Sequence, residues 1–326
     1  MEMNSRICPR LALVVPVFNE EEVLPLTSDI FLSELKSLIQ EKRVASDSYI
    51  LFVDDGSIDK SWDIIVNLNK GCSLFRGIQL SRNRGHQYAL LAGLHEVTDK
   101  CDVCVSIDCD GQDDIHAMEE MLTEYANGSE IVYGVRNDRS TDSWMKRSSA
   151  QTYYRFLKKM GGEDLVIYNH ADYRLVSNVV LQEFTNYHEV NLYLRGIFPL
   201  MGYPSSIVYY RREKRLSGQS KYSLWKMVSL AMNGITNLSV KPLRWITMMG
   251  MVIAAISFVG IIITIIQAIA GITVAGWASI ICAVCFLSGV QLISSGIIGE
   301  YVGKIYLETK HRPRYIISNR TEEEPK

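Results

Sequence analysis

Charged residues are absent from one long stretch of this sequence. Between Trp245 and Gly299 there is no Asp, Glu, Lys, Arg or His. A helix that crosses a membrane needs about 20 mostly apolar residues, so the stretch has room for a hairpin of two such helices. The segment 271–276 contains glycine at both ends and is the natural turn between helices near 246–270 and 277–298. A buried helical hairpin in a water-soluble core is the alternative, but such cores rarely run so far without a charge.

Basic residues flank this uncharged stretch and predict its orientation. The stretch is preceded by Lys241 and Arg244 and followed by Lys304, Lys310, Arg312 and Arg314. The turn carries no charge, so the positive-inside rule places both long ends of the chain in the cytoplasm. Near the N-terminus the only apolar run is the short segment 11–17. No signal peptide is therefore expected, and the N-terminal domain should stay inside.

Cysteine chemistry is not favoured, although the chain has seven cysteines. Disulfides are rare in cytosolic domains. Cys101 and Cys104 form a lone C-x-x-C motif, with no second pair and no histidine at zinc-ligand spacing. We therefore interpret these two cysteines as part of a strand in the core rather than as a metal or redox site.

Residues 1–135 alternate short β-branched runs with helical stretches, which is the pattern of a parallel sheet flanked by helices. We expect strands at 11–17, 49–53, 75–80, 102–107 and 131–135, and helices at 21–41, 61–69 and 86–96. In open sheets of this kind, ligands bind beyond the carboxyl ends of the strands. A further helix is expected near 144–159, and the tail 318–326 has the composition of a disordered segment.

Carboxylates follow the strand expected at 102–107. Asp108 and Asp110 stand one residue apart, with Gln112 and Asp113 close behind. Such side chains offer the hard oxygen ligands that Mg²⁺ or Mn²⁺ prefers. A divalent ion held there could bridge a nucleotide diphosphate and stabilise it as a leaving group. D-x-D pairs are common in loops, but the position of this pair after a buried strand favours a ligand site.

A second acidic pair, Asp54 and Asp55, follows the strand expected at 49–53. Carboxylates at such strand ends often accept hydrogen bonds from a ribose or a base. The alternative role is capping of the next helix, which Ser57 or Asp59 could supply instead. The rim of this nucleoside site is completed after the first strand by Pro16, Phe18, Asn19 and Glu20.

These motifs resemble family 2 inverting glycosyltransferases of the GT-A fold, and the resemblance covers essentially the whole chain. The nucleotide-sugar half is matched in order and spacing by VVPVFNEEEVL, FVDDGSIDKSW, SRNRGHQYALLAGL and SIDCDGQDD. Within the family the sequence is most similar to the polyprenyl-phosphate subgroup, which includes bactoprenol glucosyltransferases of the phage serotype-conversion type and dolichol-phosphate mannose synthases. That similarity is carried by the segments 169–175, 212–222 and 300–315.

The resemblance implies a role for each matching residue. Pro16, Asn19, Glu20, Asp55 and Asp108 would bind the nucleotide-sugar. A divalent cation, Mg²⁺ or Mn²⁺, would be held by Asp108, Asp110 and Gln112. The catalytic residues would be Asp172, which matches the acidic residue near the acceptor, and Asp110. One departure is Gly111, where many relatives have Leu; glycine makes the loop more flexible and removes no ligand.

A basic segment at 211–226 is expected on physical grounds to bind a phosphate. The phosphate of a lipid carries roughly −1.5 to −2 charges at pH 7, and arginine binds such oxygens bidentately. We expect the acceptor phosphate to be bound by Arg212, Arg215, Ser220 and Lys221. Simple attraction to anionic lipid is the alternative. A phosphate acceptor is already largely ionised at neutral pH, so Asp172 has less need to abstract a proton than to orient the substrates.

The expected architecture is α/β: a GT-A (Rossmann-like) nucleotide-sugar-binding domain with a C-terminal two-helix transmembrane hairpin. The expected segments are a cytoplasmic catalytic domain at 1–210, a basic juxtamembrane segment with interfacial helices at 211–244, the hairpin at 245–299 and a cytoplasmic tail at 300–326. The resemblance implies an integral protein of the bacterial inner membrane. It also implies contact with membrane lipids and a homo-oligomer such as a tetramer, and no nucleic-acid partner is expected.

The expected reaction is transfer of a single hexose, with inversion, to undecaprenyl phosphate or another polyprenyl phosphate. The product would serve the modification of a cell-envelope glycan. His170 and the segment 189–195 favour glucose from UDP-glucose over UDP-N-acetylhexosamine or GDP-mannose. A processive polysaccharide synthase is an alternative, but its Q-x-x-R-W motif is not matched, because Lys241 stands where Gln would precede Arg244 and Trp245. A non-catalytic membrane adaptor that binds nucleotide-sugars is the other alternative.

Overall fold

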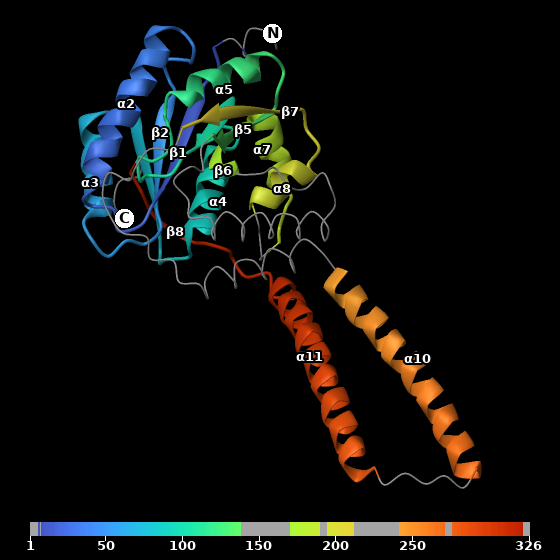
Figure 1. Ribbon diagram of the computed structural model, residues 1–326. Coiled ribbons are helices and arrows are strands. Elements are labelled where there is room, and N and C mark those ends of the chain that lie inside the picture. Colours follow the sequence, from blue (N-terminus) through green and yellow to red (C-terminus); the bar gives the residue numbers. More distant parts are fainter. Residues whose placement is uncertain are drawn as a thin grey trace. The chain divides into compact units, whose positions relative to one another are not determined.

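The computed structural model describes residues 6, 8–137, 170–189, 194–211, 241–270 and 276–321. The chain forms two compact units. One contains a β-sheet with its covering helices and ends in the C-terminal strand, and the other contains two long helices (Figure 1). We describe the units separately.

The sheet of the first unit has eight strands in the order β7-β5-β6-β4-β1-β2-β3-β8. Parallel pairing joins β4, β1, β2 and β3 at its centre, whereas β6 and β8 run antiparallel to their neighbours. The expected α/β class is confirmed, and the sheet is mixed rather than purely parallel. The strands are β1 (Leu11–Val17), β2 (Tyr49–Asp54), β3 (Phe75–Leu80), β4 (Val103–Ser106), β5 (Ile131–Arg136), β6 (His170–Ser177), β7 (Ser205–Tyr210) and β8 (Ile317–Arg320).

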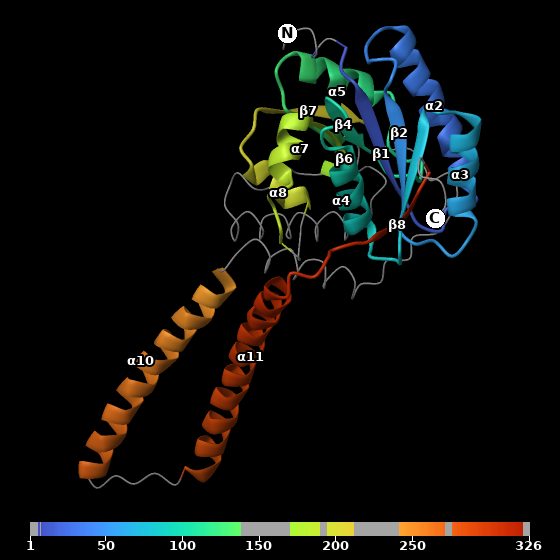
Figure 2. The ribbon, with the colours of Figure 1, turned by 180° about the vertical axis from the view of Figure 1, so that it is seen from behind.

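Helices cover both faces of this sheet. Successive side chains of a strand point to opposite sides, so a strand that is apolar throughout needs a covering layer on each face. Along β1, Leu11, Leu13 and Val15 join one apolar cluster, while Ala12 and Val14 join the other. Figures 1 and 2 show the two helical layers from opposite sides. One layer has α2 (Leu24–Gln40), α3 (Ser61–Gly71) and α5 (Ala117–Ala126); the other has α4 (His86–Val97), α7 (Asn178–Phe184) and α8 (Leu194–Leu200).

The cysteines of the C-x-x-C motif lie in the core, as expected. Cys104 is a fully buried residue of β4, and Cys101 is 5% exposed just before that strand. Burial raises the pKa of the Cys101 thiol to about 12, so it stays protonated. Both residues act as small apolar side chains, and a metal or redox role is not supported.

Helix α4 lies so close to the sheet that Gly93 has no room for a side chain. A Cβ atom there would be 2.4 Å from Cγ1 of Val14 and 2.9 Å from Cγ2 of Val53. We expect Gly93→Ala to destabilise the protein by about 1–3 kcal/mol, which outweighs the gain in helix propensity of about 1 kcal/mol. The measurement is urea unfolding. Gly71→Ala is the matched control, because nothing lies within 4 Å of a Cβ at this last residue of α3. Equal stability of the two variants would contradict the close approach of α4 to β1 and β2.

The C-terminal segment of the chain adds β8 to the edge of this sheet. Asn319 and Arg320 pair with Gln79 and Ile78 of β3, and the backbone N–H of Thr321 donates to the carbonyl of Gly77 over 3.0 Å. The sequence-based prediction of a disordered tail from Ser318 onward is therefore wrong for residues 318–321; residues 322–326 lie outside the described part. Pairing with a preformed strand edge compensates for the polar composition of the segment.

One partly buried contact of this segment is expected to make stability depend on pH. His95 of α4 lies 2.9 Å, through Nδ1, from the hydroxyl of Tyr315. Burial, followed by the positive charges of Arg314 and His188, lowers the pKa of His95 to about 4. In the unfolded chain the pKa of histidine is about 6.5, so the unfolded state binds more protons than the folded state between these values. We expect stability to be constant above about pH 6.5 and to fall as the pH drops toward 4.

Thermal unfolding of the wild-type protein and of His95→Gln between pH 8 and pH 4.5 measures this effect. Glutamine does not titrate in this range, so the variant should lose less stability on acidification. The same loss in both proteins would show that other groups cause the pH dependence.

The second unit consists of α10 (Lys241–Ile269) and α11 (Trp277–Thr309). The two helices lie where the uncharged stretch predicts them, but α10 begins earlier and α11 continues beyond Gly299. Within the described residues, which leave out several side chains of these helices, no helix is long and apolar enough to cross a membrane. Membrane crossing by this hairpin stays a prediction.

Candidate active site

Polar side chains gather at the carboxyl ends of β1, β2 and β4. These three strands are parallel neighbours, so the residues that follow them meet at one edge of the sheet. Asp54 and Asp55 come from β2, Asp108 and Asp110 from the loop after β4, and Asn19 and Glu20 from the turn after β1.

Asp55 is a buried carboxylate that holds the loop in front of α4. Its Oδ1 and Oδ2 accept hydrogen bonds from the backbone N–H groups of Arg84 and Gly85, each over 2.8 Å. Burial raises the pKa of Asp55, and these two bonds partly offset that effect. Asp54, also buried, accepts from the backbone of Ser57 and from the amide of Gln79 over 2.9 Å. Both carboxylates thus organise loops, and the nucleoside contact of Asp55 stays a prediction.

The turn after β1 is locked to the turn after β2. Asn19 adopts a left-handed backbone with φ of 53°, which asparagine tolerates better than most residues. Its side-chain oxygen accepts from the N–H of Ile58, and its own N–H donates to Oγ of Ser57, each over 3.0 Å. The N–H of Glu20 donates to Oγ of Ser61 in the same way. Pro16, which was also predicted to bind the nucleoside, is buried within β1 opposite Val53.

The loop after β4 carries the residues expected to bind metal. The side chain of Asp108 is 33% exposed, and Oδ1 of Asp110 accepts a hydrogen bond from the N–H of Gln112 over 3.1 Å. Gly111 between them has φ of 66°, a left-handed conformation that favours glycine. The glycine therefore fits a defined turn rather than a flexible loop. Across the described residues there is no group of three or more His, Cys, Asp or Glu side chains placed to hold a metal ion.

Asp172 is a buried carboxylate of β6 between two guanidinium groups. Its Oδ1 lies 2.7 Å from Nη2 of Arg174, and its Oδ2 lies 2.8 Å from Nη2 of Arg195. Burial acts to raise the pKa of Asp172, but Arg195, His86 and Arg174 outweigh it and hold the pKa well below the usual range. Asp172 is therefore charged at neutral pH and poorly suited to accept a proton.

His86 lies between Asp108, a predicted metal ligand, and Asp172, the predicted acceptor-site residue. Its Nε2 lies 3.4 Å from Oδ2 of Asp172 and 3.6 Å from Oδ1 of Asp108. The ring is 43% exposed and projects from the first residue of α4. Desolvation by the surrounding protein opposes protonation of this partly exposed side chain, but the hydrogen bond to Asp172 and the charge of Asp108 raise the pKa of His86. Sequence reasoning missed His86, although its place at a helix start near the carboxyl edge was a usable signal.

A further network lies behind the loop after β4; sequence reasoning named Asp113 but did not predict its contacts. Oδ1 of Asp113 accepts a hydrogen bond from the hydroxyl of Tyr210 over 2.6 Å and lies 3.2 Å from Nη2 of Arg136. Arg136 and Tyr210 end the neighbouring strands β5 and β7. Burial, and next the charge of Asp113, raises the pKa of Tyr210. This network anchors the acidic loop to the sheet.

The charges of this site fit a divalent cation. Burial raises the pKa of Asp108, and after the opposing effect of His86 the carboxylates of Asp113, Asp172 and Asp110 raise it further. An added positive charge would relieve this accumulation of negative charge. The donor atoms of Asp108, Asp110 and Gln112 are all oxygens of the hard type that Mg²⁺ and Mn²⁺ prefer. The predicted phosphate-binding residues Arg212, Arg215, Ser220 and Lys221 lie outside the described residues.

Comparison with known proteins identifies the family of this site. Residues 12–185 match the family described as glycosyl transferase family 2. The chain belongs to this family. The resemblance drawn from the motifs is thus confirmed.

Relatives of this glycosyltransferase match it over nearly its whole length. An uncharacterized glycosyltransferase, YkoT, of Bacillus subtilis (strain 168) is 48% identical over 95% of this chain and 91% of its own. A bactoprenol glucosyl transferase of Shigella phage SfX is 38% identical over 95% of this chain and 99% of its own. A prophage bactoprenol glucosyl transferase homolog of Escherichia coli (strain K12) is 37% identical over 94% of this chain and 98% of its own.

Proposed function

We propose that this family 2 glycosyltransferase transfers a single hexose from a nucleotide-sugar to a polyprenyl phosphate. The observation that carries the proposal is the identity of 38% to a bactoprenol glucosyl transferase across nearly the full length of both chains. The site agrees with it, because a permanently charged Asp172 suits an acceptor that needs no deprotonation. A sugar hydroxyl, by contrast, would need a base to take its proton.

In this mechanism an oxygen of the acceptor phosphate attacks the anomeric carbon directly. The bond from that carbon to the nucleotide diphosphate breaks, the configuration at the carbon is inverted, and the nucleotide diphosphate leaves. Asp172, held by Arg174 and Arg195, orients the reacting groups instead of taking a proton. A divalent cation held by Asp108, Asp110 and Gln112 would neutralise charge on the leaving diphosphate. Asp55 and the turn with Asn19, Glu20 and Pro16 would bind the nucleoside.

Arg212, Arg215, Ser220 and Lys221 are proposed to bind the acceptor phosphate. Arginine and lysine supply the charge-assisted hydrogen bonds that phosphate oxygens accept, and serine adds a neutral donor. Arg215→Gln, assayed in detergent, should lose transfer to lipid phosphate and keep donor binding. A normal rate of transfer by Arg215→Gln would mean that the basic segment 211–226 serves only to attract the protein to the membrane.

UDP-glucose is the proposed donor, undecaprenyl phosphate the proposed acceptor, and a cell-envelope glycan the proposed target of the sugar. The test is a panel of radiolabelled UDP-glucose, UDP-N-acetylglucosamine and GDP-mannose with undecaprenyl phosphate. We expect label in the lipid phase with UDP-glucose, as one sugar per lipid. A growing polymer would favour a processive synthase, and binding without turnover would favour an adaptor.

We also propose that 245–299 is a membrane hairpin and that the protein works as a homo-oligomer at the cytoplasmic face of the inner membrane. The support is the uncharged sequence together with apolar side chains that α10 exposes, such as Ile256 (68%) and Phe258 (64%). In length alone, α10 and α11, with 29 and 33 residues, exceed what is needed to cross a hydrocarbon core of about 30 Å at about 1.5 Å per residue.

Cysteine labelling in a variant without native cysteines tests this topology. A membrane-impermeant thiol reagent applied to intact cells should label Thr273→Cys, in the turn of the hairpin, and leave Glu323→Cys unlabelled. Both should react after the cells are opened. The reverse pattern would place the acidic site on the wrong side for cytoplasmic nucleotide-sugars.

A further inference from the structure

The segment 313–316, which we call the strap, crosses the loop that leads into α4. Nε of Arg84 donates to the carbonyl of Arg314 over 2.9 Å, and Nη2 of Arg84 donates to the carbonyl of Pro313 over 3.1 Å. The N–H of Ser81 donates to the carbonyl of Ile316 over 2.9 Å. Three hydrogen bonds thus tie residues near the C-terminus to the loop 81–85.

The opposite side of the loop rests on the end of β2. The N–H groups of Arg84 and Gly85 donate to the carboxylate of Asp55, so Arg84 is held by its backbone on one side and by its side chain on the other. Gly56, in the turn after Asp55, approaches the loop so closely that a Cβ atom there would be 2.5 Å from the carbonyl carbon of Arg82. The loop is therefore enclosed between the β2 turn and the strap.

The residue that follows this loop is His86. Gly85 precedes α4 with φ of 95°, and the ring of His86 then lies between Asp108 and Asp172. A shift of the loop would move His86 relative to both carboxylates, because only one residue separates it from Arg84. Displacements of about 1 Å at a reacting centre can cost about 100-fold in rate.

We propose that the strap holds the loop 81–85 in place and that Arg84 is a positioning residue for the transfer reaction, acting through His86. The inference rests on the proposed function, since it assigns His86, Asp108 and Asp172 to the reacting centre. The strap has anchors of its own: Nη1 of Arg314 donates to the carbonyl of Tyr187 over 2.9 Å, and the hydroxyl of Tyr315 lies 2.9 Å from His95. These anchors fix the strap, so that the hydrogen bonds of Arg84 can hold the loop against it.

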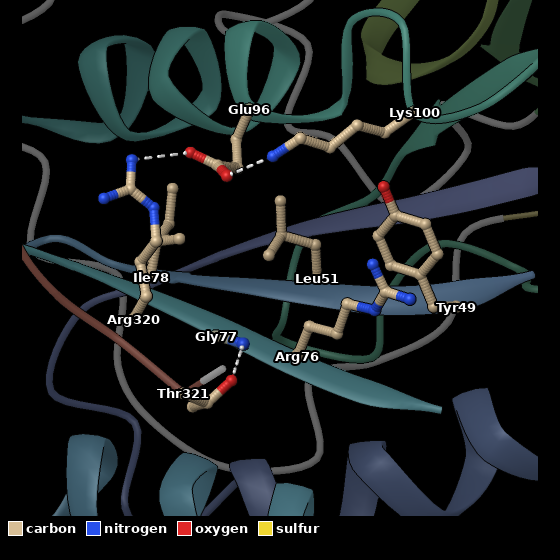
Figure 3. Close-up of a pocket in the computed structure, with 9 residues that line it drawn as sticks. All are labelled: Tyr49, Leu51, Arg76, Gly77, Ile78, Glu96, Lys100, Arg320 and Thr321. Carbon is tan, nitrogen blue, oxygen red and sulfur yellow. Dashed lines mark hydrogen bonds and ion pairs between the residues drawn. The ribbon is translucent and has the colours of Figure 1, made fainter. Parts of the chain in front are cut away.

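The far end of the same C-terminal segment is fixed at a different place, which supplies a control. Figure 3 shows Arg320 paired with Glu96, and Oγ1 of Thr321 accepting from the N–H of Gly77. The pocket that these residues line has a volume of about 30 Å³, which leaves room for about one or two water molecules and for no sugar or nucleotide. This end anchors β8 and contacts no residue of the loop 81–85 through the hydrogen bonds drawn there.

The experiment compares Arg84→Gln with Arg320→Gln in the full-length protein in detergent. Arg84→Gln removes the guanidinium that binds the strap. Arg320→Gln removes the guanidinium that ties the far end of the C-terminal segment to Glu96 of α4. Amide hydrogen exchange is measured without substrate at Ser81, Arg84 and Gly85, and kcat and KM are measured with UDP-glucose and undecaprenyl phosphate. We expect Arg84→Gln to exchange about 10-fold faster at these amides and to lose about 10-fold to 100-fold in kcat, and Arg320→Gln to match wild type in both. Arg84→Lys, which can still donate to one carbonyl, should recover part of both effects.

The outcomes separate the strap from other roles. A lower kcat with unchanged exchange would mean that Arg84 touches substrate directly, which overturns the positioning role. Faster exchange with normal kcat would also overturn it, because the loop would then not matter to the reaction. If the wild-type protein transfers nothing, the proposed function fails, and unchanged exchange in Arg84→Gln would independently refute the strap.

Discussion

Replacing Asp172 with asparagine should both stop transfer and destabilise the protein. The carboxylate balances the charges of Arg174, which is 1% exposed, and Arg195, and it also accepts a contact from His86. Removing one member of a buried ion pair costs about 3–5 kcal/mol, because the remaining charge is left without compensation. Transfer should fall by at least about 100-fold, since Arg174, Arg195 and His86 lose the group that orients them. Urea unfolding and initial rates measure the two effects.

Asp172→Glu is the comparison that separates charge from position. Glutamate keeps the negative charge, so most of the stability should return, but its longer side chain moves the carboxylate and activity should stay low. Because the pKa of Asp172 is held well below the usual range, its stabilising effect should persist unchanged at neutral pH and disappear only in strong acid. An Asp172→Asn protein with normal stability and normal rates would remove Asp172 from both roles.

Strands buried on both faces were predictable from the sequence. The predicted segments 11–17 and 75–80 coincide with β1 and β3. β1 is a continuous apolar run that is buried at every residue, as is typical of a central parallel strand, whereas β3 includes the half-buried Arg76 and Gln79. The start of α4 at His86 was also predicted. Carboxylates after such strands pointed to one edge of the sheet, which places Asp55 and Asp108 on the same side of the molecule.

The strands β6 and β8 could not be predicted from local pattern. The interior strand β6 includes Asp172 and Arg174, which interrupt the apolar pattern expected of a buried strand. The two charges can be buried because they pair with each other. The edge strand β8 has four polar-rich residues, ISNR, and its partner β3 is far away in the sequence. Arg195 and His86 meet Asp172 only through this long-range packing. No spacing in the sequence indicated these contacts, although the place of His86 at a helix start was a usable signal for that residue.

Asp110→Ala should abolish transfer that depends on a divalent cation while the protein stays folded. Asp110 is half-buried in the loop after β4, and its Oδ1 accepts a hydrogen bond from the N–H of Gln112. Loss of that bond should change stability by about 1 kcal/mol, partly offset because a negative charge near Asp108 is removed. Loss of a hard oxygen ligand withdraws several kcal/mol of charge stabilisation, on the order of 100-fold to 1,000-fold in rate.

Initial rates across a titration of Mg²⁺ or Mn²⁺, with and without EDTA, measure this loss, and thermal unfolding checks the fold. Asp102→Ala is the matched control: this exposed carboxylate lies at the opposite end of β4, where it accepts a hydrogen bond from the N–H of Arg10 over 2.7 Å. That variant should keep its response to the cation, because it lies away from the carboxyl edge of the sheet. Full activity of Asp110→Ala in EDTA would exclude Asp110 as a ligand. Full activity of the wild type in EDTA would mean that the cationic side chains near Asp172 stabilise the leaving diphosphate without a metal.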